Sequence, residues 1–140
     1  MSAAEVARFL ESSRTAVLVT TGPDGCPDPV GMWYVLDAQG RLRMRTYARS
    51  QKARNLERDP RVAVLVETGE RYGELRGVQI SGRVELDHDP ERILDVVAAL
   101  AGKYEGVESV DRGALADYAG KQVALTVVAL RVVSWDFTKL

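Results

Sequence analysis

The residues best suited to chemistry lie together in the run TYARSQKAR, residues 46–54. Ser50 is a favourable N-cap residue, so the run predicts a helix that begins at Gln51 and leaves its first backbone N–H groups without partners. The side chains around those N–H groups are hydroxyl-bearing or cationic: Thr46, Arg49, Ser50, Lys52 and Arg54. Together with the positive end of the helix dipole, they would bind a phosphate group. The alternative is a capped helix start whose charges only face solvent.

The charge of the whole chain limits the kind of partner that this run could bind. Residues 41–61 hold eight of the 19 Lys and Arg residues, but the chain also has 20 Asp and Glu residues and a net charge of −1. The near-neutral total argues against a nucleic acid or a membrane surface as the partner, yet it permits a single small anion. Arg41, Arg43 and Arg45 alternate with apolar residues, which predicts a strand with one solvent-facing cationic side.

Elsewhere the chain offers few groups for protein-based catalysis. Trp33 and Tyr34 are adjacent aromatic residues that would either flank a ligand ring or lie in the core. His88 is the only histidine and Cys26 the only cysteine, which excludes a Cys/His zinc site and an intramolecular disulfide. We find no nucleophile motif or interpretable carboxylate pair, so the sequence identifies no catalytic residue, and we predict no metal. The cysteine count and the lack of a long apolar run predict a cytoplasmic protein without a membrane segment.

The elements that must position these residues are short and closely spaced. Ser2 and Glu5 have the spacing of a capping box, which predicts an amphipathic helix at the N-terminus. A second helix over residues 51–58 ends before Pro60. The β-branched and alternating runs of the first half predict strands at residues 15–21, 29–36, 41–47 and 62–67, the first two joined by a turn at residues 23–25.

The second half contains one long helix between strands. A strand pair is predicted around residues 75–86, where Gly77 and Gly82 would mark bulges or bends. Asp89 and Pro90 predict the start of a helix over residues 92–103, closed by Gly102 or Gly106. A short helix within residues 111–120 and a long strand at residues 123–137 complete the chain. Residues 1–140 are therefore expected to form one mainly β domain, an antiparallel barrel of six or seven strands with flanking helices.

Nearly the whole chain resembles the split β-barrel flavin and deazaflavin oxidoreductases related to pyridoxamine 5'-phosphate oxidase. The most specific part is the run RTYARSQKARNLERDPRVAVLV, which is similar to the Ser-x-Lys loop and helix that hold the cofactor phosphate in that family. The resemblance implies that Thr46, Ser50 and Lys52 contact the phosphate, with Arg49 and Arg54 as helpers.

The second strand bears on the choice of cofactor. Family members that use flavin mononucleotide (FMN) carry an Arg and, five residues later, a Lys, where this chain has Pro29 and Tyr34. The run PVGMWY is instead similar, with one extra residue, to the Pro-x-Trp-Tyr strand of the actinobacterial branch that uses the 8-hydroxy-5-deazaflavin coenzyme F-420. That resemblance implies that Trp33 and Tyr34 flank the cofactor ring, and that reduced F-420 passes a hydride to an activated double bond of a small-molecule substrate.

Two other interpretations of the same residues remain open. One is an FMN-binding oxidoreductase on the same fold. The other is a non-catalytic protein that binds a flavin, a deazaflavin, a haem or another tetrapyrrole, since a phosphate loop and two aromatic residues specify binding and not turnover.

The resemblance also implies a homodimer with its cofactor sites at the subunit interface. Trp135, near the end of the last strand, would then reach the partner's site. Arg76 and Gly77, at the start of the bent strand, are further candidates for contact with the cofactor.

Overall fold

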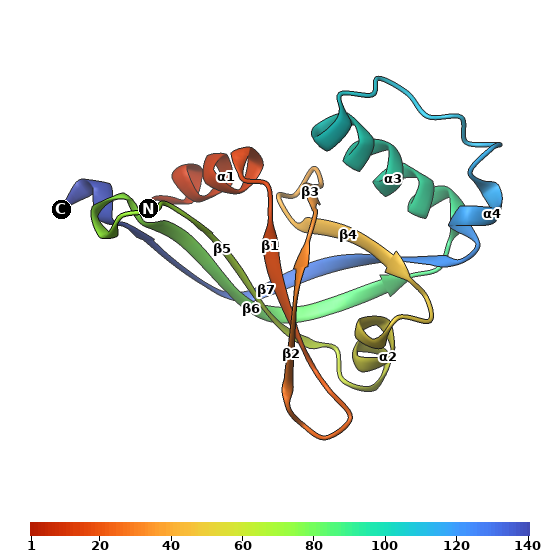
Figure 1. Cartoon of the computed structure of the whole chain (residues 1–140), viewed down its shortest axis with the longest axis horizontal. Coiled ribbons are helices and arrows are strands. Elements are labelled where there is room, and N and C mark those ends of the chain that lie inside the picture. Colours follow the sequence, from red (N-terminus) through yellow and green to blue (C-terminus); the bar gives the residue numbers. More distant parts are fainter.

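A computed structural model describes residues 1–140 and contains one antiparallel sheet with four α-helices around it (Figure 1). The strands are β1 (Ala16–Thr21), β2 (Pro27–Met32), β3 (Val35–Leu36), β4 (Leu42–Tyr47), β5 (Arg61–Thr68), β6 (Arg76–Asp87) and β7 (Gln122–Asp136). The helices are α1 (Ala3–Ser12), α2 (Gln51–Arg58), α3 (Pro90–Glu105) and α4 (Ala116–Ala119), and short 3-10 turns lie at Tyr72–Glu74 and Phe137–Lys139. The strand order is β2-β1-β5-β6-β7-β4-β3, which confirms the predicted mainly β fold with seven antiparallel strands.

The sheet curls because the strands at its two edges are joined by only two residues. β2 and β3 lie at opposite edges, yet β2 ends at Met32 and β3 begins at Val35. Three Cα–Cα steps span at most about 11 Å, so the two edges must approach each other and the sheet forms a half-barrel. The prediction of one strand over residues 29–36 is therefore wrong, because barrel closure divides this run between the two edges.

The two faces of the curled sheet have separate apolar cores. Alternate residues of β1, β4 and β5 point into the barrel, where Leu18, Met44 and Val64 are buried with Phe9 and Leu10 of α1. On the other face, α3 packs over the start of β7 in a smaller cluster of Ile93, Leu94, Val96, Leu100, Ala119 and Ala124. The sheet thus lies between α1 and α3.

Local signals in the sequence correctly placed the starts of α1, α2 and α3. The Ser2 side chain and the Glu5 side chain form the predicted capping box, and Ser50 and Asp89 cap α2 and α3. Gly106, with φ of 68°, ends α3 in the left-handed conformation that glycine adopts readily. No helix has the length and apolar character that crossing a bilayer requires.

Residues 76–87 form one long strand, so the predicted strand pair at this position is wrong. β6 pairs with β5 on one side and with β7 on the other over most of its length. A single bulge lies between Ser81 and Gly82, where a Cβ atom on Gly82 would be 2.1 Å from the carbonyl oxygen of Val128. Gly77 lies in regular strand.

Candidate functional site

The start of α2 presents unpaired hydrogen-bond donors. The Ser50 Oγ accepts hydrogen bonds from the Ala53 N–H and from the Thr46 hydroxyl, each at 3.2 Å. The backbone N–H groups of residues 49, 51 and 52 make no hydrogen bond within the chain. Three amide donors at the positive end of a helix form a site suited to an anion.

The cations predicted at this site lack acidic partners. Arg41 and Arg61 pair with Asp37 and Asp59, whereas no carboxylate lies within ion-pair distance of Arg49, Lys52 or Arg54. Lys52 is half-buried and Arg49 and Arg54 are exposed. Residues two apart on a helix point in different directions, so Lys52 and Arg54 do not share a face of α2. The structure groups Thr46, Arg49, Ser50 and Lys52 around the start of α2 and leaves Arg54 to one side.

A buried amide, not singled out in the sequence, fixes the orientation of α2. Asn55 is fully buried, and its Nδ2 donates hydrogen bonds to Thr20 Oγ1 at 3.0 Å and to Asp28 Oδ2 at 3.1 Å. Its Oδ1 accepts a hydrogen bond from Gln51 Nε2 at 2.8 Å. These bonds attach α2 to β1 and β2, so the donors at its start are held by the barrel wall. The sequence signal that could have identified Asn55 is its position as a polar residue on the apolar face of α2, beside Ala53 and Leu56.

A cavity of about 600 Å³ lies between α3, the end of β2 and β4. Its walls are mostly apolar and include Met32, Trp33, Val97, Leu100, Leu115 and Tyr118. Arg45 and Glu105 are the only charged residues in its lining. Arg45 directly precedes Thr46 on β4, so the cavity and the start of α2 involve neighbouring residues of that strand whose side chains point to opposite faces. A cavity of this size and composition can hold a small organic molecule.

The cationic side of β4 is covered by α3, which corrects the prediction of a solvent-facing strand side. Arg43 and Arg45 are half-buried, and the Nε atom of Arg43 is buried without a partner. The guanidinium carbon of Arg45 lies 5.6 Å from the ring centroid of Tyr118, in cation–π geometry. Only Arg41 is exposed as expected.

Trp33 and Tyr34 lie in opposite environments. Trp33 is 51% exposed on the cavity wall, and one face of its indole stacks on the Tyr104 ring at 4.3 Å between centroids. Tyr34 is fully buried, its hydroxyl donates a hydrogen bond to the Leu10 carbonyl, and burial raises its pKa. Of the two, only Trp33 has surface available to a ligand. Tyr34 lies in the core, which was one of the two positions that the sequence left open for it.

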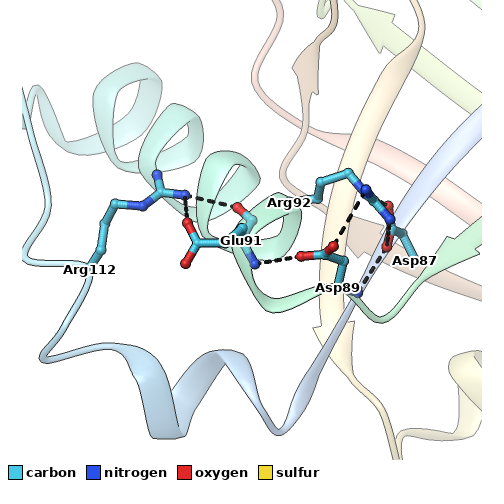
Figure 2. A network of polar contacts seen from close by, with 5 residues as sticks. All are labelled: Asp87, Asp89, Glu91, Arg92 and Arg112. Atoms are coloured by element: carbon cyan, nitrogen blue, oxygen red, sulfur yellow. Dashed lines mark hydrogen bonds and ion pairs between the residues drawn. The ribbon is translucent and has the colours of Figure 1, made fainter.

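A polar network attaches the far wall of the cavity to α3 (Figure 2). Asp89 caps the helix, and Arg92 pairs with both Asp87 and Asp89. Arg112 donates to the Glu91 carbonyl at 2.9 Å and pairs with Glu91 and Asp95. The Arg112 contacts hold the segment that follows α3, whose Val110 and Leu115 line the cavity, and the Arg92 contacts join the start of α3 to the end of β6.

The remaining predicted residues, Arg76, Gly77 and Trp135, lie together at the other end of the β6–β7 ribbon. Gly77 pairs with Trp135, and a Cβ atom on Gly77 would be 2.2 Å from the indole Cζ2. On β7, Trp135 is twelve positions beyond Val123, the residue that pairs with Thr46. Twelve residues of strand extend up to about 40 Å. One chain therefore does not bring these three residues to the start of α2.

Comparison with known families and structures agrees with this architecture. A model described as pyridoxamine 5'-phosphate oxidase matches residues 2–138. A conserved hypothetical protein from Mycobacterium tuberculosis is 42% identical, with a TM-score of 0.92 over 99% of this chain and 87% of that one. No curated protein matches the chain.

More distant structures share the fold with different bound groups in their names. An F-420 reductase is 26% identical, with a TM-score of 0.71 over 90% of this chain and 94% of that one. The haem storage protein of Vibrio cholerae is 16% identical, with a TM-score of 0.70 over 94% of this chain and 92% of that one. At that identity the likeness is one of fold alone.

Proposed function

The chain belongs to the pyridoxamine 5'-phosphate oxidase family, and on that premise we propose that it is an F-420-dependent reductase. The observation that carries the proposal is the anion site at the start of α2. Three free backbone N–H groups, together with the unpaired side chains of Arg49 and Lys52, would hold the cofactor phosphate. Neither cation needs to give up an internal ion pair to do so.

The cavity beside α3 would hold the ring of such a cofactor. Trp33 has a free indole face on the cavity wall, and the apolar residues of α3 would exclude water from a planar ring. When bound, reduced F-420 supplies a hydride donor, so the protein needs to supply position and a dry environment more than acid–base groups. Arg45, the single cation in the cavity, would hold an anionic group of the cofactor or the substrate.

Pro29 and Tyr34 favour F-420 over FMN. They occupy the positions where FMN-binding members carry a pair of cations, and neither can replace a charge. Pro29 is exposed on β2 and Tyr34 is buried. The similarity to an F-420 reductase over most of both chains supports the same cofactor.

The test is a fluorescence titration of the purified protein with F-420 and, separately, with FMN. We expect tighter binding of F-420, and a loss of about 1–3 kcal/mol in binding free energy for Lys52→Ala, as for removal of a charge-assisted contact. Arg8→Ala, an exposed cation on α1, is the matched control and should have no effect. Equal affinity of wild type and Lys52→Ala for both cofactors would contradict the phosphate assignment.

The same titration separates the other functions that the residues allow. Tighter binding of FMN would identify a flavoprotein on this fold. Stoichiometric F-420 binding, with no oxidation of the reduced cofactor by a panel of enones, quinones and tetrapyrroles, would identify a carrier in place of an enzyme.

A homodimer is the second part of the proposal. Leu130, Val132 and Val133 are exposed apolar residues on β7, at 77%, 48% and 38%. A second copy would cover this surface and could bring Trp135 to the start of its partner's α2. Sedimentation of the purified protein at several concentrations tests the dimer, and a monomer throughout would contradict it.

A further inference from the structure

Trp33 and Tyr34 link two strands without belonging to either, so their backbone depends on other elements for hydrogen bonds. The C-terminal turn of α3 supplies them. Tyr34 N–H donates to the Tyr104 hydroxyl at 3.1 Å, and Lys103 Nζ donates to the Tyr34 carbonyl at 3.1 Å. The strand linker is thus held by two side chains from a helix.

The Tyr104 hydroxyl is also bonded to the segment before β1. Its oxygen lies 2.7 Å from the Arg14 carbonyl and 3.1 Å from the Tyr34 carbonyl, and its one proton favours the shorter bond. Burial raises the pKa of Tyr104, so the hydroxyl stays protonated as this donor. One hydroxyl therefore accepts from the linker and donates to the chain that leads into β1.

Cations lie over the rings of both Tyr104 and Tyr34. The Arg14 guanidinium carbon lies 4.8 Å from the Tyr104 ring centroid, and Lys103 Nζ lies 3.9 Å from the Tyr34 ring centroid. Such contacts are strongest where water is partly excluded, as it is at Lys103, whose pKa burial lowers. The Tyr104 ring is therefore restrained by its hydroxyl and by Arg14.

The restrained ring of Tyr104 stacks on the indole of Trp33. The two rings stack at 4.3 Å with an angle of 5° between their planes, which leaves the other face of Trp33 at the cavity. We propose that Tyr104 is a positioning residue that holds the indole of Trp33 at the cavity wall so that its free face receives a planar ligand ring. The ligand part of this proposal rests on the proposed function, whereas the positioning of Trp33 does not.

The experiment uses Trp33 as its own reporter. The chain has two tryptophans, so in a Trp135→Phe background all tryptophan emission comes from Trp33. In that background Tyr104→Leu removes the stack and the hydrogen bonds, and Tyr104→Phe removes only the hydrogen bonds. F-420 affinity is measured on the same Tyr104 variants with Trp135 intact, because Trp135 is itself proposed to reach the partner's cofactor site. Tyr72→Leu is the matched control, because Tyr72 is an exposed tyrosine that contacts Phe137 at the other end of the molecule.

We expect Tyr104→Leu to shift the Trp33 emission to longer wavelength, to reduce its near-ultraviolet circular dichroism, and to weaken F-420 binding about three- to tenfold. Tyr104→Phe should restore most of the dichroism and part of the affinity, and Tyr72→Leu should match the background protein. Trp33 signals unchanged in Tyr104→Leu would overturn the proposal, as would altered signals with unchanged F-420 affinity. If Tyr104→Leu does not fold, the Trp33 signals and the F-420 affinity of Tyr104→Phe test the proposal in its place.

Failure of the proposed function gives a different result. A wild-type protein that binds neither F-420 nor FMN contradicts the reductase, while the emission and dichroism of the Tyr104 variants still show whether this residue positions Trp33.

Discussion

The two ends of the β6–β7 ribbon differ in how completely one chain builds them. At the Asp87 end, β4, α2 and α3 surround the ribbon and supply an anion site and a cavity. At the Trp135 end, the ribbon extends to the two chain termini, with exposed apolar residues on β7 (Figure 1). The first end combines unpaired hydrogen-bond donors with a cavity, and the second exposes apolar side chains to solvent. Residues that the family resemblance assigns to one site are thus divided between two distant places.

The largest expected effect comes from mixing two defective variants. If Lys52 of one subunit and Trp135 of its partner complete one site, Lys52→Ala and Trp135→Ala should each bind F-420 weakly. Dimers exchanged from an equal mixture should recover about a quarter of the wild-type sites, because half of them are mixed and each mixed dimer has one intact site. The measurement is stoichiometric F-420 binding after subunit exchange. No recovery despite proven exchange would place both residues in the site of one chain, or Trp135 outside it.

The second prediction concerns the bulge that bends the ribbon between its two ends. Gly82→Ala would place a Cβ atom 2.1 Å from the Val128 carbonyl oxygen, a backbone atom that cannot move without breaking the pairing. We expect a loss of about 1–3 kcal/mol in the free energy of unfolding, measured by urea denaturation. Gly73→Ala, with no atom within 4 Å of the added Cβ, should cost far less. Similar midpoints for the two variants would mean that the bulge has room to relax.

A smaller effect is expected at the Trp135 end. In Gly77→Ala the added Cβ meets the Trp135 indole at 2.2 Å, but an indole at a half-exposed site can rotate away. The free energy of unfolding should fall by about 1 kcal/mol, with a change in Trp135 emission in a Trp33→Phe background. F-420 affinity should fall as well if Trp135 completes the partner's site. Unchanged emission would show that the ring does not pack on Gly77 in solution.

The smallest effect is a pH dependence that separates the two ends. The hydrogen bond from Arg92 holds the pKa of Asp87 below its usual 3.8, and the hydrogen bonds from Thr138 do the same for Asp136. A carboxylate with a lowered pKa in the folded state stabilises the protein above pH 3.8, and this stability is lost as the pH falls through the lowered value. Because both carboxylates are near the surface, solvent screening keeps their contributions to stability small.

Two variants separate the contributions of Asp87 and Asp136 to the loss of stability in acid. Arg92→Met should remove the part of the loss of stability between pH 5 and pH 2 that comes from Asp87, and Thr138→Val should remove part of the contribution from Asp136. Urea denaturation across this range measures both. Identical pH profiles for wild type and Arg92→Met would show that the pair at the start of α3 does not form in solution.

Features that depend on neighbouring residues were predictable from the sequence. The capping box at Ser2 and Glu5, the cap at Ser50 and the start of α3 at Asp89 each involve groups within a few positions, so their hydrogen bonds follow from local sequence. The same holds for the unpaired N–H groups of α2, which every helix start possesses.

Features that depend on docking between distant elements were not predictable. The run at residues 29–36 has a uniform apolar character, yet closure of the barrel divides it at Trp33 and Tyr34. The alternation at Arg43 and Arg45 predicts two faces of a strand, but only the docking of α3 determines that the cationic face is covered. Side-chain periodicity gives the direction of a residue, and it does not tell what lies in that direction.

The sequence by itself determined the order of the elements, the helix starts and a basic loop able to hold one phosphate, because these follow from backbone hydrogen bonding and local charge. Tertiary structure decided which of two adjacent aromatic residues keeps its ring exposed at the cavity. Trp33 and Tyr34 are adjacent and similar in chemistry, but α1 and α3 bury Tyr34 while the Tyr104 ring holds Trp33 at the cavity. The physical reason is that burial depends on the surfaces that long-range packing brings together, and those surfaces come from segments about seventy residues apart.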